Sequence, residues 1–230
     1  MARTESRVGM SPTGVGLEHT EALIFTKPIS YLITTGKMTN ADFDRGCSRL
    51  VAVVERAVES GVSLIQIREK SLSARLLFRL TCSVVAATRG TSTRVLVNDR
   101  ADIAFGAGAD GVHLTGNSIS PAIIRRSFGP GFLIGVSTHN VDDVVEVADA
   151  GADFAVFGPV FDTPGKSDDR KGVDELQRAC VTVSPFPVVA IGGVDAGSVD
   201  EVMAAGASGV AAIRAFDDVD SMHQLLTKLK

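Results

Sequence analysis

Short apolar runs rich in β-branched residues alternate along the chain with longer segments in which apolar residues recur at helical spacing. Such short runs are typical of buried strands, and the longer segments are typical of amphipathic helices. The pattern predicts eight strands, at Ile29–Thr35, Leu64–Arg68, Arg94–Val97, Gly111–Leu114, Leu133–Val136, Phe154–Phe157, Val188–Ile191 and Gly209–Ile213. Regular alternation of strands with helices indicates a parallel sheet.

A helix is predicted after every strand. The eight helices are expected at Asp44–Ser60, Ser73–Thr88, Ala101–Gly106, Pro121–Phe128, Asn140–Ala150, Val173–Thr182, Ser198–Ala205 and Met222–Leu229. Eight strand–helix units within about 200 residues predict an α/β fold made of one (β/α)8 TIM barrel. An open doubly wound sheet is the alternative, but no G-x-G-x-x-G follows the first strand and no P-loop is present. We expect residues 28–230 to form the barrel and residues 1–27 to be a flexible N-terminal extension.

A weak internal repeat supports this organisation. The segments ESGVSLIQI, GAGADGVHL, DAGADFAVF and AAGASGVAA each join the end of a helix to a strand. They contain Gly61, Gly108, Gly151 and Gly206, which we expect at the left-handed position that ends a helix.

Composition excludes several classes of protein. Of the 230 residues, 45% are hydrophobic and 22% are charged, which is typical of a globular domain with a large core. The net charge of −4, the absence of a Lys/Arg block and the aromatic content of 5% argue against nucleic acid as a partner. No apolar run approaches about 18 residues, so no membrane span is expected. The sequence does not decide between a monomer and a homo-oligomer.

The cysteine count indicates the compartment. Cys47, Cys82 and Cys180 are odd in number and form no C-x-x-C pair. We interpret them as apolar helix residues of a protein in a reducing compartment, and therefore expect a cytoplasmic location.

Candidate site residues lie where the predicted strands end, because chemistry in a barrel takes place on the loops after the strands. In LIQIREK, Ile65 and Ile67 are expected to pack against helices, which turns Gln66 and Arg68 into the barrel and leaves Lys70 at its rim. An anionic ligand would satisfy these cations. An internal ion pair for Arg68 and simple solvation of Lys70 are the alternatives.

The next three strand ends carry further polar residues. Asn98 and Asp99 follow the third strand, and Asp99 could ligate Mg²⁺, cap the next helix or pair with Arg100. His113 ends the fourth strand, where a hydrogen-bonded structural role is the more common one. Ser137 and His139 follow the fifth strand and are candidates for substrate contact, while Asn140 could cap the next helix.

The last loops suggest phosphate binding. Loop six, GPVFDTPGKSDDRKG, is long and carries Lys166, which could close over an anion. Gly192 and Gly193 follow the seventh strand, where backbone N–H groups commonly form a phosphate pocket. On this basis Gly193→Val is expected to impair phosphate binding and to leave the fold largely intact.

The segments YLITT, QIREK, VNDRADIA, GADGVHL, GVSTHN, FGPVFDTPGK and AIGGV occur in this order between residues 29 and 216. In order and spacing they resemble the thiamin phosphate synthase and thiazole tautomerase superfamily, whose members are (β/α)8 barrels. The resemblance implies a synthase that joins hydroxymethylpyrimidine diphosphate to hydroxyethylthiazole phosphate and releases diphosphate.

The resemblance also implies roles for individual residues. Gln66, Arg68, Lys70 and Asn98 would hold the pyrimidine diphosphate, Asp99 would ligate Mg²⁺, Ser137 and Lys166 would stabilise the departing diphosphate, Thr163 would contact substrate, and Gly192 and Gly193 would bind the thiazole phosphate.

Some positions depart from the synthase pattern. Ser118 stands where synthases have a second Mg²⁺-binding Asp, and Arg214 stands where a serine is expected after the eighth strand. Residues 116–128 look more like the tautomerase branch, whose catalytic histidine would match His139. A thiazole tautomerase acting on thiazole carboxylate phosphate, or a barrel that binds thiazole or pyrimidine phosphates without turnover, is therefore the alternative function.

Overall fold

The structure, a computed structural model, describes residues 28–162, 170–214 and 219–229. The predicted N-terminal extension, residues 1–27, lies outside this part of the chain. The strands are β1 (Ile29–Ile33), β2 (Leu64–Ile67), β3 (Arg94–Asn98), β4 (Gly111–Leu114), β5 (Leu133–Thr138), β6 (Phe154–Phe157), β7 (Val188–Ile191) and β8 (Gly209–Ala212). The helices are α1 (Phe43–Glu59), α2 (Ala74–Thr88), α3 (Ala101–Ala107), α4 (Pro121–Phe128), α5 (Val141–Asp149), α6 (Val173–Val183), α7 (Val199–Ala204) and α8 (Val219–Lys228).

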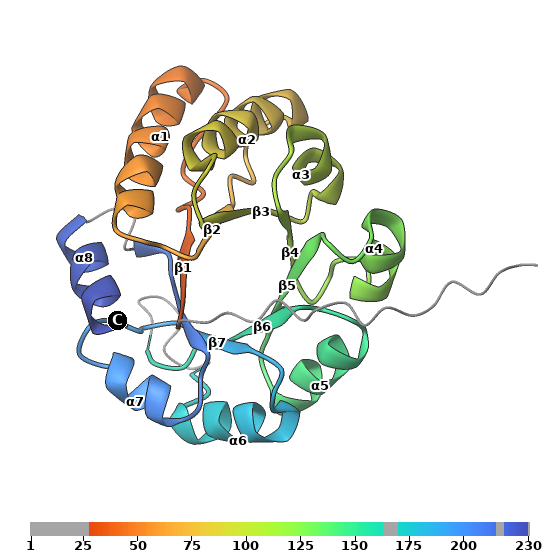
Figure 1. The fold of residues 1–230 in the computed structure, drawn as a ribbon, viewed down its shortest axis with the longest axis vertical. Coiled ribbons are helices and arrows are strands. Elements are labelled where there is room, and N and C mark those ends of the chain that lie inside the picture. The colour runs from red at the N-terminus through yellow and green to blue at the C-terminus, as the bar shows by residue number, and fades with distance from the viewer. Residues whose placement is uncertain (1–27, 163–169, 215–218, 230) are drawn as a thin grey trace, which may run out of the picture.

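The strands form a closed parallel barrel in chain order, and the helices surround it (Figure 1). Strand β1 pairs with both β2 and β8, so the sheet has no open edge. The predicted (β/α)8 barrel is therefore confirmed, and the doubly wound alternative is wrong. Among the described residues, no helix has the length and the apolar character needed to cross a membrane.

Within the described part of the chain, three helices begin at side-chain caps. Ser73 accepts a hydrogen bond from the first turn of α2, and Ser120 does the same for α4, where Pro121 occupies the first helical position. The amide oxygen of Asn140 accepts the backbone N–H of Asp143 at 2.8 Å, so Asn140 caps α5 as predicted. These oxygens satisfy N–H groups that have no partner within the helix.

Apolar side chains fill both faces of the barrel wall. Tyr31, Leu64 and Phe154 belong to the core inside the barrel, whereas Ile65 and Ile67 pack in the layer between strands and helices. Gln66 is 1% exposed and alternates with these isoleucines, so it faces the interior as predicted.

The internal repeat has a structural explanation in two parts. First, its four glycines have φ between 73° and 91°, the left-handed conformation expected at helix ends. Second, in two of the four segments an aspartate two positions after the glycine holds the preceding strand. Asp110 accepts the backbone N–H of Val95 at 2.7 Å, and Asp153 accepts that of Ile134 at 2.6 Å. These contacts lie at the amino ends of the strands, so this part of the repeat stabilises the fold.

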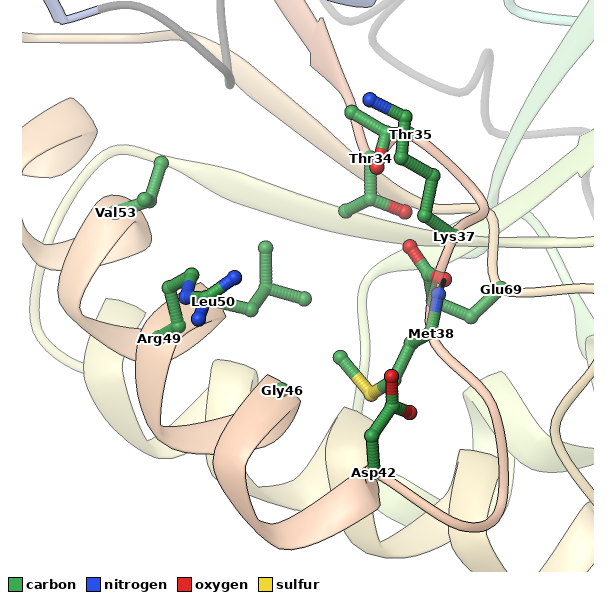
Figure 2. Close-up of a pocket in the computed structure, with 10 residues that line it drawn as sticks. All are labelled: Thr34, Thr35, Lys37, Met38, Asp42, Gly46, Arg49, Leu50, Val53 and Glu69. Carbon is green, nitrogen blue, oxygen red and sulfur yellow. Dashed lines mark hydrogen bonds between the residues drawn. The ribbon is translucent and has the colours of Figure 1, made fainter.

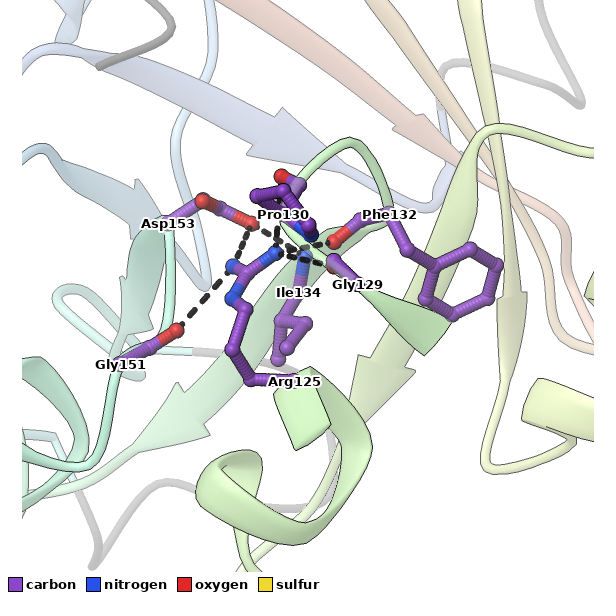
Figure 3. Close-up of polar contacts among 7 residues, drawn as sticks. All are labelled: Arg125, Gly129, Pro130, Phe132, Ile134, Gly151 and Asp153. Atoms are coloured by element: carbon purple, nitrogen blue, oxygen red, sulfur yellow. Dashed lines mark hydrogen bonds and ion pairs between the residues drawn. The ribbon is translucent and has the colours of Figure 1, made fainter. Parts of the chain in front are cut away.

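Arg125 on α4 joins two loops at the amino ends of β5 and β6 (Figure 3). One Nη donates to the carbonyl oxygens of Gly129, Pro130 and Phe132 at 2.8–3.1 Å. The other donates to the Gly151 carbonyl at 3.1 Å and to the Asp153 carboxylate at 2.8 Å. The four Nη hydrogens of a single guanidinium are thus shared among five acceptors that connect consecutive units of the barrel.

Replacing this guanidinium is expected to destabilise the fold. Arg125→Met should lower the free energy of unfolding by about 1–3 kcal/mol, because partly buried acceptors lose their donors. Arg125→Lys should recover only part of the loss, since one ammonium cannot reach all of the acceptors. Urea unfolding measures both variants, with Arg178→Met as the control, because Arg178 makes a solvent-exposed ion pair with Glu175. Equal effects at the two arginines would contradict the prediction.

Candidate active site

Polar side chains from four neighbouring strands meet at the carboxyl ends of β2, β3, β4 and β5, together with the loop after β4. Gln66, Asn98, Asp99 and Ser118 form a first hydrogen-bonded chain. The Gln66 amide nitrogen donates to Asn98 Oδ1 at 3.1 Å, and Asn98 Nδ2 donates to Asp99 Oδ2 at 2.9 Å. The Ser118 hydroxyl donates to Asp99 Oδ1. The barrel thus brings together the predicted residues of β2 and β3.

The first chain has a buried end. Gln66 Oε1 is inaccessible to solvent and has no hydrogen-bond partner among the described residues, whereas the amide nitrogen of the same side chain is bonded. A buried acceptor without a partner costs about 1–3 kcal/mol. A ligand N–H group would satisfy this oxygen.

Asp99, at the other end of this chain, is exposed and has a left-handed backbone with φ of 58°. This conformation is uncommon for a residue other than glycine and often marks a functional position. Two of the interpretations of Asp99 from the sequence are wrong. The helix α3 has Arg100 at its N-cap position and no side-chain cap, and Arg100 pairs with Asp102 at 2.6 Å. Instead, the two carboxylate oxygens of Asp99 accept hydrogen bonds from Asn98 and Ser118.

A second hydrogen-bonded chain crosses the barrel from β1 to β5. The Tyr31 hydroxyl lies 3.1 Å from His113 Nδ1, and His113 Nε2 lies 2.9 Å from Ser137 Oγ. Tyr31 and His113 are 1% and 2% exposed, whereas Ser137 is partly exposed. We name these three residues the Tyr31–His113–Ser137 relay.

The relay is uncharged. Burial, with a smaller contribution from the positive charge of Arg68, lowers the pKa of His113 from 6.5 to about 3. Burial also raises the pKa of Tyr31 above its ordinary value. Near neutral pH both rings are therefore neutral, and the imidazole has one N–H and one acceptor nitrogen.

This lowered pKa predicts a loss of stability in acid. The unfolded chain binds a proton at His113 below about pH 6.5, whereas the folded chain does not until about pH 3. The free energy of unfolding should therefore fall as the pH is lowered through this window, by up to about 1.4 kcal/mol per pH unit from this group. Chemical unfolding across the window should show a shallower pH dependence for His113→Asn, and an unchanged one for the exposed His223→Asn. Identical slopes for wild type and His113→Asn would contradict this.

His139 lies at the end of β5, outside the relay. Its Nδ1 is 2.6 Å from the carbonyl oxygen of Gly158, which can only accept a hydrogen bond, so Nδ1 carries the hydrogen. In the neutral ring Nε2 is then an acceptor, and the side chain is exposed. The hydrogen bond to Gly158 thus fixes the tautomer of the neutral ring and leaves Nε2 able to accept a hydrogen.

The cations that follow β2 differ in burial. Arg68 is half-buried, and its backbone N–H donates to Thr34 Oγ1 at 2.8 Å, whereas Lys70 is exposed. No carboxylate partner of Arg68 lies within the described ranges, which gives no support to the internal ion pair. Lys70 likewise has no carboxylate partner within the described ranges.

Glu69, between these two cations, is a residue that the sequence analysis missed. It is 4% exposed, and its carboxylate accepts the backbone N–H groups of Gly36 at 3.1 Å and Met38 at 2.9 Å. It therefore holds the loop after β1. This carboxylate lines a pocket of about 200 Å³ between that loop and α1. Figure 2 shows Glu69 at the edge of the pocket. None of the predicted site residues within the described ranges lines the pocket.

Gly192 and Gly193 follow β7 with φ of 94° and 67°. Neither backbone N–H has an acceptor within the part of the chain that the structure describes, as a phosphate site requires. The expectation that Gly193→Val leaves the fold intact is wrong, because an added Cβ would lie 2.6 Å from Phe161 Cβ and 2.7 Å from the Asp162 carbonyl oxygen. Loop six packs directly on this glycine.

The remaining predicted residues lie outside the site or outside the described ranges. Thr163 and Lys166 fall on residues that the structure does not describe. Arg214, after β8, is exposed.

Tyr31, like Glu69, was not among the residues predicted from the sequence. Its place between Ile29 and Ile33 in the first strand nevertheless indicates an inward-facing side chain.

The residues present fit a magnesium ion only in part. Mg²⁺ prefers oxygen ligands and keeps several waters, so one carboxylate and one hydroxyl, from Asp99 and Ser118, are compatible with an ion held mainly by substrate oxygens. Across the described residues, no group of three or more His, Cys, Asp or Glu side chains is arranged to hold a metal by itself.

The fold and the two hydrogen-bonded networks, one from Gln66 to Ser118 and the other the Tyr31–His113–Ser137 relay, define a (β/α)8 barrel with a polar site at the carboxyl ends of its strands. Residues 30–216 match the thiamine monophosphate synthase family, and the chain belongs to this family.

Similar proteins agree with this assignment. The chain is 37% identical to the thiamine-phosphate synthase of Chloroflexus aurantiacus over 197 aligned residues. The aligned region covers 84% of this chain and 90% of that protein. It is 42% identical over 161 residues to the thiamine-phosphate synthase of Methanoculleus marisnigri, covering 69% and 76% of the two chains. Among solved structures, the thiamine phosphate pyrophosphorylase of Pyrococcus furiosus matches with a TM-score of 0.73 and 28% identity, over 88% of this chain and 93% of that one.

Proposed function

We propose that this chain joins hydroxymethylpyrimidine diphosphate to hydroxyethylthiazole phosphate, forming thiamin phosphate and diphosphate. The observation that carries the proposal is that Gln66 Oε1 is buried and has no partner among the described residues, while the amide nitrogen of Gln66 begins a series of hydrogen bonds through Asn98 to Asp99. An aminopyrimidine supplies the N–H group that this oxygen lacks, and its diphosphate supplies the anion that a site beside Arg68 and Lys70 requires.

The reaction breaks one bond and forms another. The bond from the pyrimidine methylene carbon to the diphosphate oxygen breaks, and its electron pair leaves with diphosphate. The thiazole nitrogen then donates its lone pair to the carbon, so no general base is needed. The residues of the chain act by holding the two substrates and by stabilising the negative charge that develops on diphosphate.

Named residues supply these roles. Gln66 and Asn98 bind the pyrimidine, Arg68 and Lys70 bind its diphosphate, and Ser137 donates to the departing oxygens. Gly192 and Gly193 bind the thiazole phosphate through backbone N–H groups, and Thr163 and Lys166 in loop six complete the anion site. Asp99, with Ser118 beside it, would hold Mg²⁺, which when bound neutralises diphosphate charge. We also propose a cytoplasmic location, which the three free thiols support.

A product assay tests the proposal. The protein is incubated with both substrates and Mg²⁺, and separately with thiazole carboxylate phosphate. Equimolar thiamin phosphate and diphosphate are expected in the first reaction. Isomerisation of thiazole carboxylate phosphate with no coupling would instead favour the tautomerase, for which the hydrogen bond from His139 Nδ1 to Gly158, leaving Nε2 as an acceptor, is the supporting observation. Binding without either product would indicate a non-catalytic barrel.

The anion site predicts a specific loss. Arg68→Ala should lower kcat/KM by about 10- to 100-fold, because it removes charge-assisted hydrogen bonds to diphosphate. Arg178→Ala, at an exposed arginine on α6, is the matched control and should leave the rate unchanged. Steady-state kinetics with the pyrimidine diphosphate varied measures both variants. Equal rates for the Arg68 variant and wild type would place the diphosphate elsewhere.

A further inference from the structure

The direction of the hydrogen bonds in the Tyr31–His113–Ser137 relay follows from what surrounds Tyr31. Its ring packs inside the barrel against apolar side chains, including Phe154 at 5.6 Å between ring centroids. Within the described ranges, the only hydrogen-bond partner of the tyrosine hydroxyl is His113 Nδ1, at 3.1 Å. The hydroxyl hydrogen therefore has one acceptor available.

Of the two ways to orient the relay, one leaves a buried donor unsatisfied. If Nδ1 carried the hydrogen, it would donate to the tyrosine oxygen, and the O–H of Tyr31 would have no acceptor in an apolar interior. Such an orphaned donor costs about tenfold or more in equilibrium terms. If Tyr31 donates to Nδ1, the hydrogen of the neutral imidazole is on Nε2, which donates to Ser137 Oγ at 2.9 Å. The second orientation satisfies both buried donors.

The consequence appears at the mouth of the barrel. Ser137 Oγ already accepts from Nε2, so its own hydrogen is left to donate outward, from a side chain that is partly exposed. In the opposite orientation the serine would donate to the imidazole and present only lone pairs, which repel an anion.

We propose that Tyr31 and His113 are positioning residues that fix the Ser137 hydroxyl as a hydrogen-bond donor toward a phosphate-type anion at the mouth of the barrel. The identity of that anion as the departing diphosphate rests on the proposed function. The direction of the relay does not.

The first test reads the imidazole directly. Nitrogen-15 NMR of the unaltered protein with labelled histidine should assign the pyrrole-type signal of His113 to Nε2 and the pyridine-type signal to Nδ1, with His113→Gln used to identify the signals. The reverse assignment would overturn the proposal. This test does not depend on turnover or on the folding of any Tyr31 variant.

The second test measures binding of inorganic diphosphate by calorimetry in a double-mutant cycle. Ser137→Ala is expected to weaken binding about tenfold, and Tyr31→Phe by about three- to tenfold. In the Ser137→Ala background Tyr31→Phe should have no further effect, because Tyr31 acts through the serine. Equal weakening in both backgrounds, or no binding to the unaltered protein, would overturn the proposal.

A matched control separates positioning from general destabilisation. Thr93→Val removes another buried hydroxyl, which donates to the Val62 carbonyl at 2.7 Å at the opposite end of the barrel. It should lower stability and leave diphosphate affinity unchanged. If the unaltered protein binds diphosphate but forms no thiamin phosphate, the proposed function fails. The relay is still judged by the NMR assignment and by the cycle.

Discussion

Chelating Mg²⁺ with EDTA is expected to lower the rate of thiamin phosphate formation by about 10³-fold or more, because the charge that develops on diphosphate then has only protein cations to stabilise it. The same assay should show that His139→Ala keeps most of the activity, since attack of the thiazole nitrogen requires no proton abstraction. A tautomerase would behave in the opposite way, with metal-independent turnover and a loss of about 10²- to 10⁴-fold on removal of the imidazole. That pattern would refute the synthase proposal.

Ser118 supplies a matched variant for the metal prediction. With one carboxylate at the site, synthase activity should require a high Mg²⁺ concentration, and Ser118→Asp should lower that requirement. In the absence of metal the same change places a second carboxylate beside Asp99, where the serine hydroxyl now donates a hydrogen bond. We therefore expect Ser118→Asp to lower the Tm without Mg²⁺ and to increase the rise in Tm that Mg²⁺ produces. An unchanged response to Mg²⁺ would argue against a metal at Asp99.

Gly193→Ala is expected to lower the free energy of unfolding by about 2–4 kcal/mol. Alanine would have to adopt the left-handed backbone of this position, where φ is 67°. Its methyl group would also lie 2.6 Å from Phe161 Cβ. Chemical unfolding is the measurement. Gly131→Ala is the control, because a Cβ there meets nothing within 4 Å, and its effect should stay within about 0.5 kcal/mol. Similar stability for the two variants would contradict the packing argument.

The close contacts at Gly193 limit how the phosphate site can be tested. A variant at Gly193 changes loop packing as well as any ligand contact, so loss of binding would not identify the cause. The amide nitrogen-15 shifts of Gly192 and Gly193 in the unaltered protein test the site without this ambiguity. Addition of hydroxyethylthiazole phosphate should move both, if their N–H groups bind its phosphate.

The sequence by itself determined the barrel, the glycine helix ends of its repeat and the inward face of Gln66. Apolar runs and helix caps are local signals, because a strand needs alternating burial and a helix start needs an oxygen for its N–H groups. The alternation in LIQIREK therefore correctly turned Gln66 inward. The glycines of the repeat were predictable for the same reason, since a left-handed helix end is a property of a few consecutive residues.

Only the tertiary structure decided which polar groups meet. Tyr31 and Ser137 lie on β1 and β5 and connect only because the sheet closes and His113 reaches both of them. The burial of Glu69 and the packing of loop six on Gly193 are likewise contacts between segments distant in sequence. Local pattern assigns each residue a face and an element. The hydrogen-bond and packing partners of each side chain are decided by closure of the barrel and by the exclusion of water from its interior. A local sequence pattern contains neither.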